Sequence, residues 1–388
     1  MKKLIRITTV PLSLDKLLEG QLRFMREHYQ VTAISSDEPY LKRIGEREGV
    51  ATHTLEMTRK ITPFRDAWAI LQLTLYFLKH QPDIVHSHTP KAGLVAMTAA
   101  FLARVPVRLH TVAGLPLLET TGMKRKLLEW VDRITYVFAT KVYPNSKGLE
   151  AIMVQNRYCP AKKMKVLANG SSNGITTHYF DKSVVSATTI EVLQSKLSIL
   201  PDDFVFVFVG RLVADKGINE LVRAFENLTK INGQHHDKKC KLLLVGPFES
   251  ELDPLDEETL KVIASRTDII AVGYQADVRP YLALAQALAF PSYREGFPNV
   301  VMQAGAMGLP VVATNINGCN EIIQHLSNGL LIPVKEVGAL QEAMELLYTD
   351  KVLYQKLKSN ARSAITARYE QRVVWEAVLA EYVAVAGR

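Results

Sequence analysis

The chain has 388 residues, of which 48% are hydrophobic and 22% are charged, and its formal net charge at pH 7 is +8. This length and composition exclude disordered, fibrous and repeat-built chains and predict a globular protein of two domains. Its three cysteines form no paired framework, which argues against a disulfide scaffold and favours a reducing, cytoplasmic location.

The N-terminal segment, residues 1–10, carries two lysines as a signal peptide does, but Arg6 and two threonines interrupt its apolar run. We therefore expect it to be the first strand of the fold. The longest apolar stretch, residues 92–103, is much shorter than the about 20 residues that a membrane-spanning helix requires. The sequence thus predicts no membrane span.

Short apolar runs alternate with helical stretches along both halves of the chain. In the first half we expect strands at Leu4–Val10, Val31–Ser35, Ile84–Ser87, Val107–Thr111 and Lys141–Pro144. In the second half we expect them at Phe204–Val209, Lys241–Val245, Ile269–Val272, Leu288–Phe290 and Val311–Ala313. This alternation predicts an α/β fold with two Rossmann-like domains, each a parallel sheet covered by helices.

Turn-forming residues are concentrated between the two series. The segment 169–180 is rich in Gly, Ser, Asn and Thr, and we expect it to be the hinge. We therefore place the domains at residues 1–178 and 179–370. Residues 371–388 are expected to form a last helix whose apolar face carries Val374, Trp375, Val378 and Tyr382.

Positive charge is concentrated in the first half of the chain. Residues 1–178 carry 26 Lys and Arg against 14 Asp and Glu, a balance of +12, whereas the balance of the remaining residues is −4. Such asymmetry indicates that the first half faces a polyanion, either an anionic membrane surface or a nucleic acid. Residues 124–134 combine three basic residues with Leu, Trp, Val and Ile at helical spacing, which suits a membrane interface. A core helix with a charged outer face has the same pattern, so both interpretations stay open.

His86 and His88 lie on one face of a predicted strand, because side chains alternate along a strand. Together with His110 they are candidates for a metal site, but the chain has no pair of carboxylates at D-x-D spacing. We expect hydrogen-bonded histidines at strand ends, and neither a metal nor another cofactor.

Two basic residues follow the apolar strand that opens the second half. Residues 204–225 read as this strand, a turn and an amphipathic helix, and Arg211 and Lys216 lie in the turn. A guanidinium group is a planar fork and an ammonium group a compact charge, and both suit phosphate oxygens. The alternative is that both are solvated turn residues.

Residues 292–323 are the most informative segment of the chain. They predict a strand end, a turn, a short helix at about residues 298–307 and another strand. Pro298 suits the first helical turn, whereas Gly308 and Pro310 end the helix.

The start of this short helix predicts a phosphate site. The turn at residues 296–300 presents free backbone N–H groups and the positive end of the helix dipole. Gln303 lies roughly 6–7 Å further along the helix, about the span of a diphosphate, so Glu295 and Gln303 can contact groups on its opposite sides.

The Glu295 segment resembles the signature of the retaining family-4 glycosyltransferases of GT-B fold, in which a second Glu follows the first after seven residues. This chain departs from that pattern, because the second position is Gln303. The Gly210-Arg211 turn and Lys216 are similar to the phosphate-binding turn of the family, and the resemblance covers nearly the whole chain. It implies two Rossmann-like domains facing each other across a deep cleft, with the last helix crossing back to the first domain.

The resemblance also implies that residues 179–370 bind a nucleotide-sugar donor. Arg211 and Lys216 would hold its diphosphate, and Glu295 would contact the sugar near the reacting carbon. Gln303 would bind the ribose without the charge that strengthens a carboxylate hydrogen bond. The implied donor-binding residues are Gly210, Arg211, Lys216, Glu295, Gly296, Phe297, Pro298, Asn299, Val300 and Gln303. The implied catalytic residues are Glu295, His110, Arg211 and Lys216.

By the same resemblance, residues 1–178 bind the acceptor. Ser13 and Gly20 lie in a segment similar to the acceptor-side loop and first helix of the family. His110 lies in a loop that matches the family's His-containing loop, from which it would reach the donor sugar.

The implied activity is a metal-independent, retaining hexosyl transfer from a UDP-sugar to a saccharide acceptor, lipid-linked, in bacterial capsule or O-antigen biosynthesis at the cytoplasmic membrane face. Two alternatives are a sugar-nucleotide epimerase of GT-B type and a non-catalytic nucleic-acid-binding protein. The spacing of Arg211, Lys216 and Glu295 argues against the epimerase, and no nucleic-acid-binding signature supports the second. We expect an anionic membrane surface, and no nucleic acid, as a partner.

Overall fold

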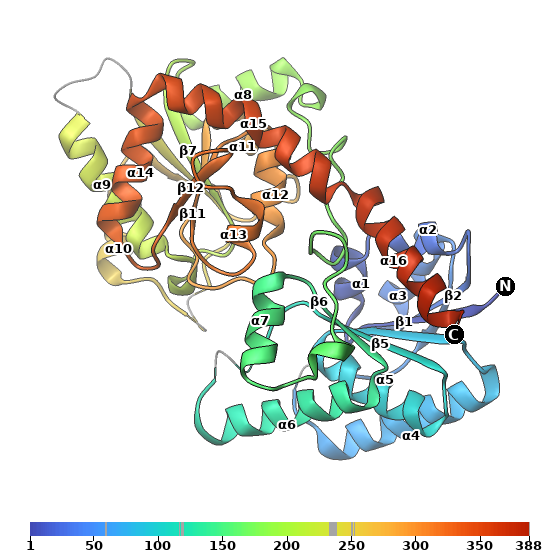
Figure 1. Cartoon of the computed structure of the whole chain (residues 1–388). Helices are drawn as coiled ribbons and strands as arrows, with labels where there is room; N and C mark the ends of the chain where they lie inside the picture. The colour runs from blue at the N-terminus through green and yellow to red at the C-terminus, as the bar shows by residue number, and fades with distance from the viewer. Residues whose placement is uncertain are drawn as a thin grey trace. The chain divides into compact units, whose positions relative to one another are not determined.

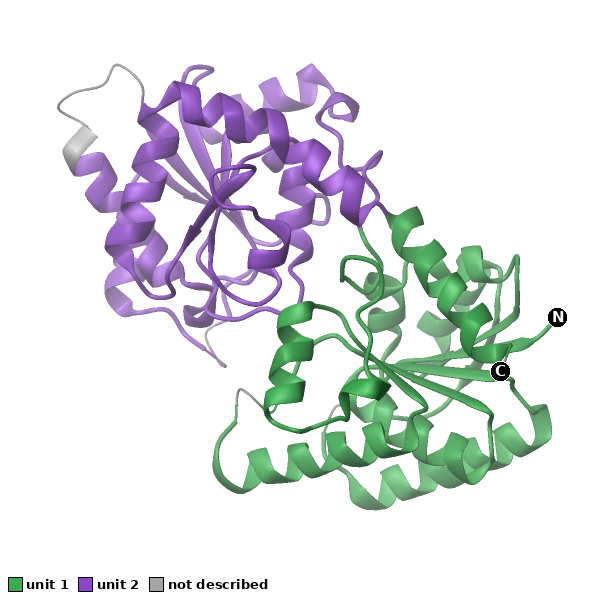
Figure 2. Ribbon diagram, in the orientation of Figure 1, with its two compact units in different colours: residues 1–174, 371–388 green, residues 175–370 purple. Residues whose placement is uncertain are grey.

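The computed structural model describes residues 1–58, 60–115, 117, 120–232, 239–249, 251 and 253–387. It divides the chain into two compact units (Figure 2). Unit 1 is Met1–Gly174 with Gln371–Arg388, and unit 2 is Ile175–Glu370, whereas the sequence placed the boundary at residue 178. Pro116, in the His110 loop, and Arg388 lie outside the described residues.

Unit 1 is built on a parallel sheet with the strand order β3-β2-β1-β4-β5-β6. Its strands are β1 (Lys3–Ile7), β2 (Gln30–Ser35), β3 (Ala51–Thr54), β4 (Ile84–His88), β5 (Val107–Val112) and β6 (Lys141–Pro144). The sequence analysis missed β3, because this edge strand is polar, reads ATHT and is only partly buried. The predicted extension of β1 to Val10 is wrong, since Pro11 begins a helix for which Val10 is the N-cap residue.

Helices cover both faces of this sheet (Figure 1). They are α1 (Pro11–Leu17), α2 (Gln21–Met25), α3 (Glu38–Glu48), α4 (Pro63–His80), α5 (Pro90–Leu102), α6 (Gly122–Phe138), α7 (Lys147–Gln155) and α16 (Gln371–Ala386). Alternate residues of β1 enter different cores: Ile5 packs in the core with α4, α5 and α6, and Leu4 in the core with α1, α2 and α16. Among the described residues, no helix is long and apolar enough to cross a membrane.

Unit 2 repeats this plan with the order β12-β11-β10-β7-β8-β9. Its strands are β7 (Phe204–Val209), β8 (Cys240–Val245), β9 (Ile269–Ala271), β10 (Ala287–Phe290), β11 (Val311–Thr314) and β12 (Gly329–Ile332). Its helices are α8 (Ala187–Leu197), α9 (Ile218–Asn232), α10 (Glu257–Ser265), α11 (Arg279–Leu284), α12 (Asn299–Ala306), α13 (Cys319–Ile322), α14 (Val337–Thr349) and α15 (Lys351–Tyr369). The sequence analysis missed β12, whose four residues are too few to show a periodicity.

The two sheets have the same topology, because counting from β7 gives the order 3-2-1-4-5-6 in unit 2 as well. This is the doubly wound order, so the prediction of two Rossmann-like domains is confirmed. In such sheets ligands bind beyond the carboxyl ends of the strands, at the point where the strand order reverses. That point lies between β1 and β4 in unit 1 and between β7 and β10 in unit 2.

The last helix, α16, belongs to unit 1 although it follows unit 2 in the chain. Val374, Val378 and Tyr382 are buried on its inner side. The Trp375 indole Nε1 donates a hydrogen bond of 2.7 Å to Asn173 Oδ1. These contacts fix α16 on the layer formed by α1 and α2.

Candidate active site

In unit 2 the loops after β7 and β10 bring a cation and a carboxylate into contact. Lys216 ends a 3-10 turn, Ala214–Lys216, and its Nζ lies 2.6 Å from Glu295 Oε1. The Ser292 hydroxyl donates a second hydrogen bond, of 2.9 Å, to the same oxygen. The Lys216 and Glu295 side chains are 17% and 15% exposed. The pair is therefore held in place and still reachable from solvent.

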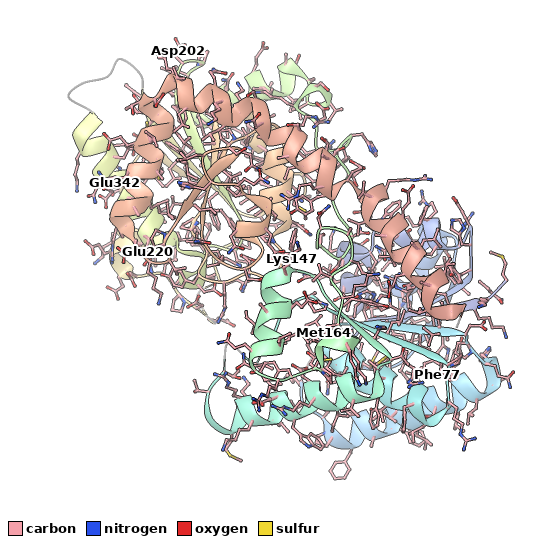
Figure 3. The ribbon with its side chains drawn as sticks, in the orientation of Figure 1. Phe77, Lys147, Met164, Asp202, Glu220 and Glu342 are labelled. Carbon is pink, nitrogen blue, oxygen red and sulfur yellow. The ribbon has the colours of Figure 1, made fainter. Side chains whose placement is uncertain are left out.

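A glycine allows the two loops to approach each other. Gly217 has φ +72°, and a Cβ placed there would lie 2.2 Å from the carbonyl oxygen of Pro291. Any other residue would clash with this backbone, and a positive φ also favours glycine. The Tyr293 N–H donates to the Asp215 carbonyl oxygen at 2.8 Å, which adds a direct link between the loops. The Tyr293 hydroxyl also donates a hydrogen bond to Glu220 of α9, and Glu220 is labelled in Figure 3.

Arg211 lies at the carboxyl end of β7, directly after Gly210. Its guanidinium forms an ion pair of 2.8 Å with Glu249, and its side chain is 45% exposed. The hydrogen bond to Glu249 raises the pKa of Arg211, and the negative charges of Asp215 and Glu295 act in the same direction. Arg211 is thus charged and near the Lys216–Glu295 pair, but its present partner is Glu249.

The start of α12 lies next to Glu295. The helix begins at Asn299, not at Pro298 as predicted, because Pro298 is the N-cap residue with extended backbone (φ −76°, ψ 109°). No side chain within the described ranges caps this end, so the first N–H groups stay available to an anion. Asn317 Nδ2 donates to the carbonyl oxygens of Glu295 and Gly296, at 3.2 and 2.8 Å, and thereby fixes the turn.

The remaining predicted donor residues lie along the same turn and helix. Val300 and Gln303 are partly buried, Asn299 is exposed, and the Phe297 ring lies 5.4 Å from the ring of Tyr369. The Gln303 amide makes no hydrogen bond to any residue that the structure describes, so both its donor and its acceptor are available. In unit 2 the predicted residues therefore lie in the loops that follow β7 and β10 and on α12, and Pro298 among them is buried.

In unit 1 the predicted residue His110 is buried at the carboxyl end of β5. Its Nδ1 lies 2.8 Å from the Ser87 hydroxyl of the neighbouring strand. Burial lowers the pKa of His110 to about 4, against the opposite effect of a hydrogen bond with the Ser87 backbone, so its ring is neutral at pH 7. Gly93 of α5 makes room for this ring, because a Cβ there would lie 2.5 Å from His110 Cε1.

The other two histidines belong to a hydrogen-bonded cluster, as expected. His86 pairs through Nδ1 with the Tyr382 hydroxyl at 2.6 Å and through Nε2 with the Thr111 hydroxyl at 2.8 Å. His88 Nε2 lies 3.0 Å from Nη2 of the fully buried Arg6. Burial is the main cause that lowers the pKa of both histidines. In the described part of the chain, no group of three His, Cys, Asp or Glu side chains is arranged to hold a metal ion.

Of the two residues predicted on the acceptor side, Ser13 lies in α1 and Gly20 is the N-cap residue of α2. Ser13 is half-buried on α1. Gly20 has φ +75°, and a Cβ there would lie 2.7 Å from Trp375 Cη2. The small residue at position 20 therefore makes room for α16 within unit 1.

Two side chains of α6, Asp132 and Tyr136, were missed by the sequence analysis. Together with His110 they line a cavity of about 190 Å³ at the carboxyl ends of β4 and β5, which we call the α6 cavity. Its other lining residues are Thr89, Pro90, Thr111, Val112, Ala113, Gly114 and Leu115. The available signal was an acidic residue in the inward-facing stripe of an amphipathic helix, between Leu128 and Thr135.

The outer side of the helix layer of unit 1 carries exposed apolar and basic side chains. On α6, Leu127 and Trp130 are exposed beside Lys124 and Lys126. Helix α4 carries a longer stripe, also missed by the sequence analysis, at four- and three-residue spacing: Phe64, Trp68, Leu71, Leu75 and Leu78. The inner side of α4 faces the core, where Phe77, labelled in Figure 3, is buried. We call the exposed residues of α4 and α6 named here the α4/α6 surface.

Comparison with known proteins matches both halves of the chain to glycosyltransferases. Residues 189–364 match the family model of the glycosyl transferases group 1, and residues 19–170 match that of a glycosyl transferase 4-like domain. The chain is 31% identical, over 98% of its length and 97% of the relative's, to the capsular polysaccharide biosynthesis glycosyltransferase CapM of Staphylococcus aureus.

A second relative and one solved structure have lower sequence identity to this chain. The relative is the UDP-Gal:alpha-D-GlcNAc-diphosphoundecaprenol alpha-1,3-galactosyltransferase of Escherichia coli, 26% identical over 80% of this chain and 77% of its own. Among solved structures, Anabaena HepE in complex with UDP and glucose superposes with a TM-score of 0.80. The two chains are 20% identical, and the match covers 99% of this chain and 100% of HepE, which shows a shared fold.

Proposed function

The chain belongs to the glycosyl transferases group 1 family, and from this premise we propose that it moves a sugar from a UDP-sugar to a lipid-linked saccharide. The observation that carries the donor half of this proposal is the Lys216–Glu295 pair beside the uncapped start of α12. The family assignment replaces the epimerase and the nucleic-acid-binding alternatives, because the matching models and relatives are glycosyltransferases.

The donor diphosphate would bind between the β7 loop and the start of α12. Lys216 and Arg211 supply positive charge, and the N–H groups of Asn299 and Val300 supply hydrogen bonds. As the bond between sugar and diphosphate breaks, negative charge grows on the leaving phosphate. Groups already fixed around it stabilise this charge without having to reorganise. We propose that these groups make the transfer independent of a divalent metal.

Glu295 would orient the donor sugar. Its Oε1 is held by Lys216 and Ser292, which leaves Oε2 to accept a hydrogen bond from a sugar hydroxyl. We propose retention of the anomeric configuration through front-face attack, in which the leaving phosphate takes the acceptor's proton. On α12, Gln303 would bind the ribose.

The acceptor would be a saccharide on a lipid diphosphate, in bacterial surface polysaccharide synthesis. Support comes from the names of the relatives: CapM acts in capsular polysaccharide biosynthesis, and the E. coli enzyme uses a diphosphoundecaprenol-linked sugar. The α4/α6 surface supports docking of unit 1 to an anionic bilayer, because its aromatic and leucine side chains can enter the interface while Lys124 and Lys126 contact lipid phosphates.

The test is calorimetric titration with UDP, GDP and ADP, followed by turnover with the matching nucleotide sugars. We expect UDP to bind and the other two to bind more weakly. Hydrolysis of the donor in the absence of acceptor, followed by NMR at early times, should give a sugar with the donor's anomeric configuration. Equal affinity for the three nucleotides, or an inverted product, would contradict the proposal.

A further inference from the structure

Unit 1 contains a cavity in which two side chains, Asp132 and Tyr136, have no role in the proposed donor chemistry. We propose that the α6 cavity is the acceptor-sugar subsite, in which Asp132 and Tyr136 bind hydroxyl groups of a neutral pyranose ring. This inference rests on the proposed function, since it names the part of the acceptor that unit 1 recognises.

The first argument is that two buried polar groups have no partner. Asp132 is 7% exposed and Tyr136 is 2% exposed. Neither the Asp132 carboxylate nor the Tyr136 hydroxyl makes a hydrogen bond or an ion pair with any described residue. Their spacing of four residues places them next to each other on one side of α6. The oxygens of both side chains are not among the fully enclosed atoms that lack a partner, so they open into the cavity, where the hydroxyl groups of a ligand can pair with them.

The second argument is the chemistry of the lining. Pro90, Val112 and Leu115 present apolar surface, which suits the C–H faces of a sugar ring. No Lys or Arg lies among the lining residues within the described ranges, and the Asp132 carboxylate repels anions. The cavity is therefore built for the neutral, hydroxylated part of an acceptor and not for its diphosphate. A small apolar site with a few convergent polar groups is a common form of ligand site.

The protonation behaviour of Asp132 suits a hydroxylated ligand. Burial raises the pKa of Asp132 to about 7, so both forms of the carboxyl group are populated near neutral pH. A hydroxyl group can donate to the ionised form and accept from the protonated form. The ionisable groups that share the cavity, His110 and Tyr136, are neutral in this range, because burial lowers the pKa of His110 to about 4 and raises that of Tyr136.

The third argument is the backbone at the cavity wall. Thr89 precedes α5 with φ +73° and ψ 145°, a conformation that is rare for a β-branched residue. Its hydroxyl lies 2.8 Å from the Thr9 hydroxyl instead of capping the helix. Strained residues of this kind are held by their surroundings and occur most often at ligand sites. Thr89 lines the same cavity as Asp132 and Tyr136, so its backbone conformation is separate evidence for a ligand site there.

The experiment is saturation-transfer NMR on the full chain with the methyl α-glycosides of glucose, galactose and N-acetylglucosamine as probes. We expect at least one glycoside to receive saturation from the wild-type protein. Asp132→Leu removes the carboxylate but keeps the volume, and we expect it to abolish the transfer. Tyr136→Phe removes one hydroxyl, and we expect a reduced transfer. The matched control is Glu129→Leu, which also replaces a carboxylate of α6 with leucine. Glu129 is half-exposed and does not line the cavity, so this variant should bind the glycosides as the wild type does.

Thermal unfolding of each variant establishes that it is folded, and Asp132→Leu is expected to raise the melting temperature because it removes an unpaired buried carboxyl group. Absence of transfer to every glycoside in the wild type, or unchanged transfer in Asp132→Leu, would overturn the inference. UDP titrations on the same samples separate it from the proposed function. Binding of UDP without binding of glycosides overturns only the acceptor subsite. Binding of glycosides without binding of UDP overturns the donor proposal, and with it the acceptor role, but leaves a sugar site in the α6 cavity.

Discussion

Lys216 Nζ lies 2.6 Å from Glu295 Oε1, although the two residues are far apart in the sequence and follow different strands of the unit 2 sheet. The contact exists because β7 and β10 are neighbours whose carboxyl ends share one edge. Without a ligand, the lysine neutralises the carboxylate. In the proposed donor complex, the same lysine would bind a phosphate oxygen and Glu295 would bind the sugar.

The first prediction concerns Glu295. Glu295→Gln keeps the shape and an acceptor for Ser292 but removes the charge that we propose orients the donor sugar. We expect turnover to fall by about 10²-fold or more, as when one fixed polar group at a reacting centre is removed. UDP affinity, measured by calorimetry, should remain, because the nucleotide contacts are elsewhere. Normal turnover in this variant would remove Glu295 from the catalytic group.

The second prediction concerns Arg211. If its guanidinium makes charge-assisted hydrogen bonds to the diphosphate, Arg211→Ala should lose about 1.5–3 kcal/mol, or roughly 10- to 150-fold in kcat/KM. The matched control is Glu249→Gln, which releases Arg211 from its present partner and should not lower kcat/KM. If both changes have the same effect, Arg211 acts through its ion pair with Glu249 and not on the donor.

The third prediction concerns Gln303, which lies where the family has a carboxylate. Gln303→Glu should tighten UDP binding by about 0.5–1.5 kcal/mol, because a charged acceptor strengthens the hydrogen bonds to the ribose hydroxyls. Gln303→Ala should weaken the binding and serves as the opposite control. Calorimetry with UDP decides between these outcomes. An affinity that neither change alters would place the ribose away from Gln303.

The fourth prediction is a pH dependence of stability that arises from Asp132. Burial raises its pKa to about 7 from an ordinary 3.8, so between these values the folded state holds a proton that the unfolded state has lost. The contribution of this group to the free energy of unfolding therefore decreases as the pH rises through this window, by at most about 1.4 kcal/mol per pH unit. Asp132→Asn should remove this slope. The free energy of unfolding of the variant, relative to that of the wild type, should therefore increase from pH 4 to pH 7. Urea unfolding at several pH values measures it, and parallel curves would contradict the prediction.

The fifth prediction concerns the α4/α6 surface. Leu75→Ser should weaken binding to vesicles that contain anionic lipid, because the exposed leucine would otherwise bury apolar area in the interface. Val192→Ser changes a comparably exposed apolar residue of α8 in unit 2 and should have no effect. Binding of the wild type should also fall as the salt concentration rises, since the lysines of α6 contribute about 1 kcal/mol each near the surface. Equal co-sedimentation with neutral and anionic vesicles would exclude this role.

The amino-acid sequence by itself determined the fold class and the family. Short, continuous apolar runs such as residues 204–209 and 311–313 are typical of strands that are buried on both faces. Their alternation with amphipathic helices predicts parallel sheets covered by helices. The sequence also predicted that Arg211, Lys216 and Glu295 lie near one another, because residues directly after parallel strands share one edge of the sheet.

Only the tertiary structure decided which side of each helix is buried and which distant residues meet. The sequence analysis did not identify the stripe of α4 that begins at Phe64. This stripe faces outward, because the other side of α4 packs on α5 and in the core of unit 1. Asp132, which the sequence analysis also missed, lines a cavity with His110. Gly20 must be small because Trp375, a residue of the last helix, lies against it. Local sequence carries propensity and periodicity, whereas burial and pairing depend on contacts between segments that the chain order does not specify.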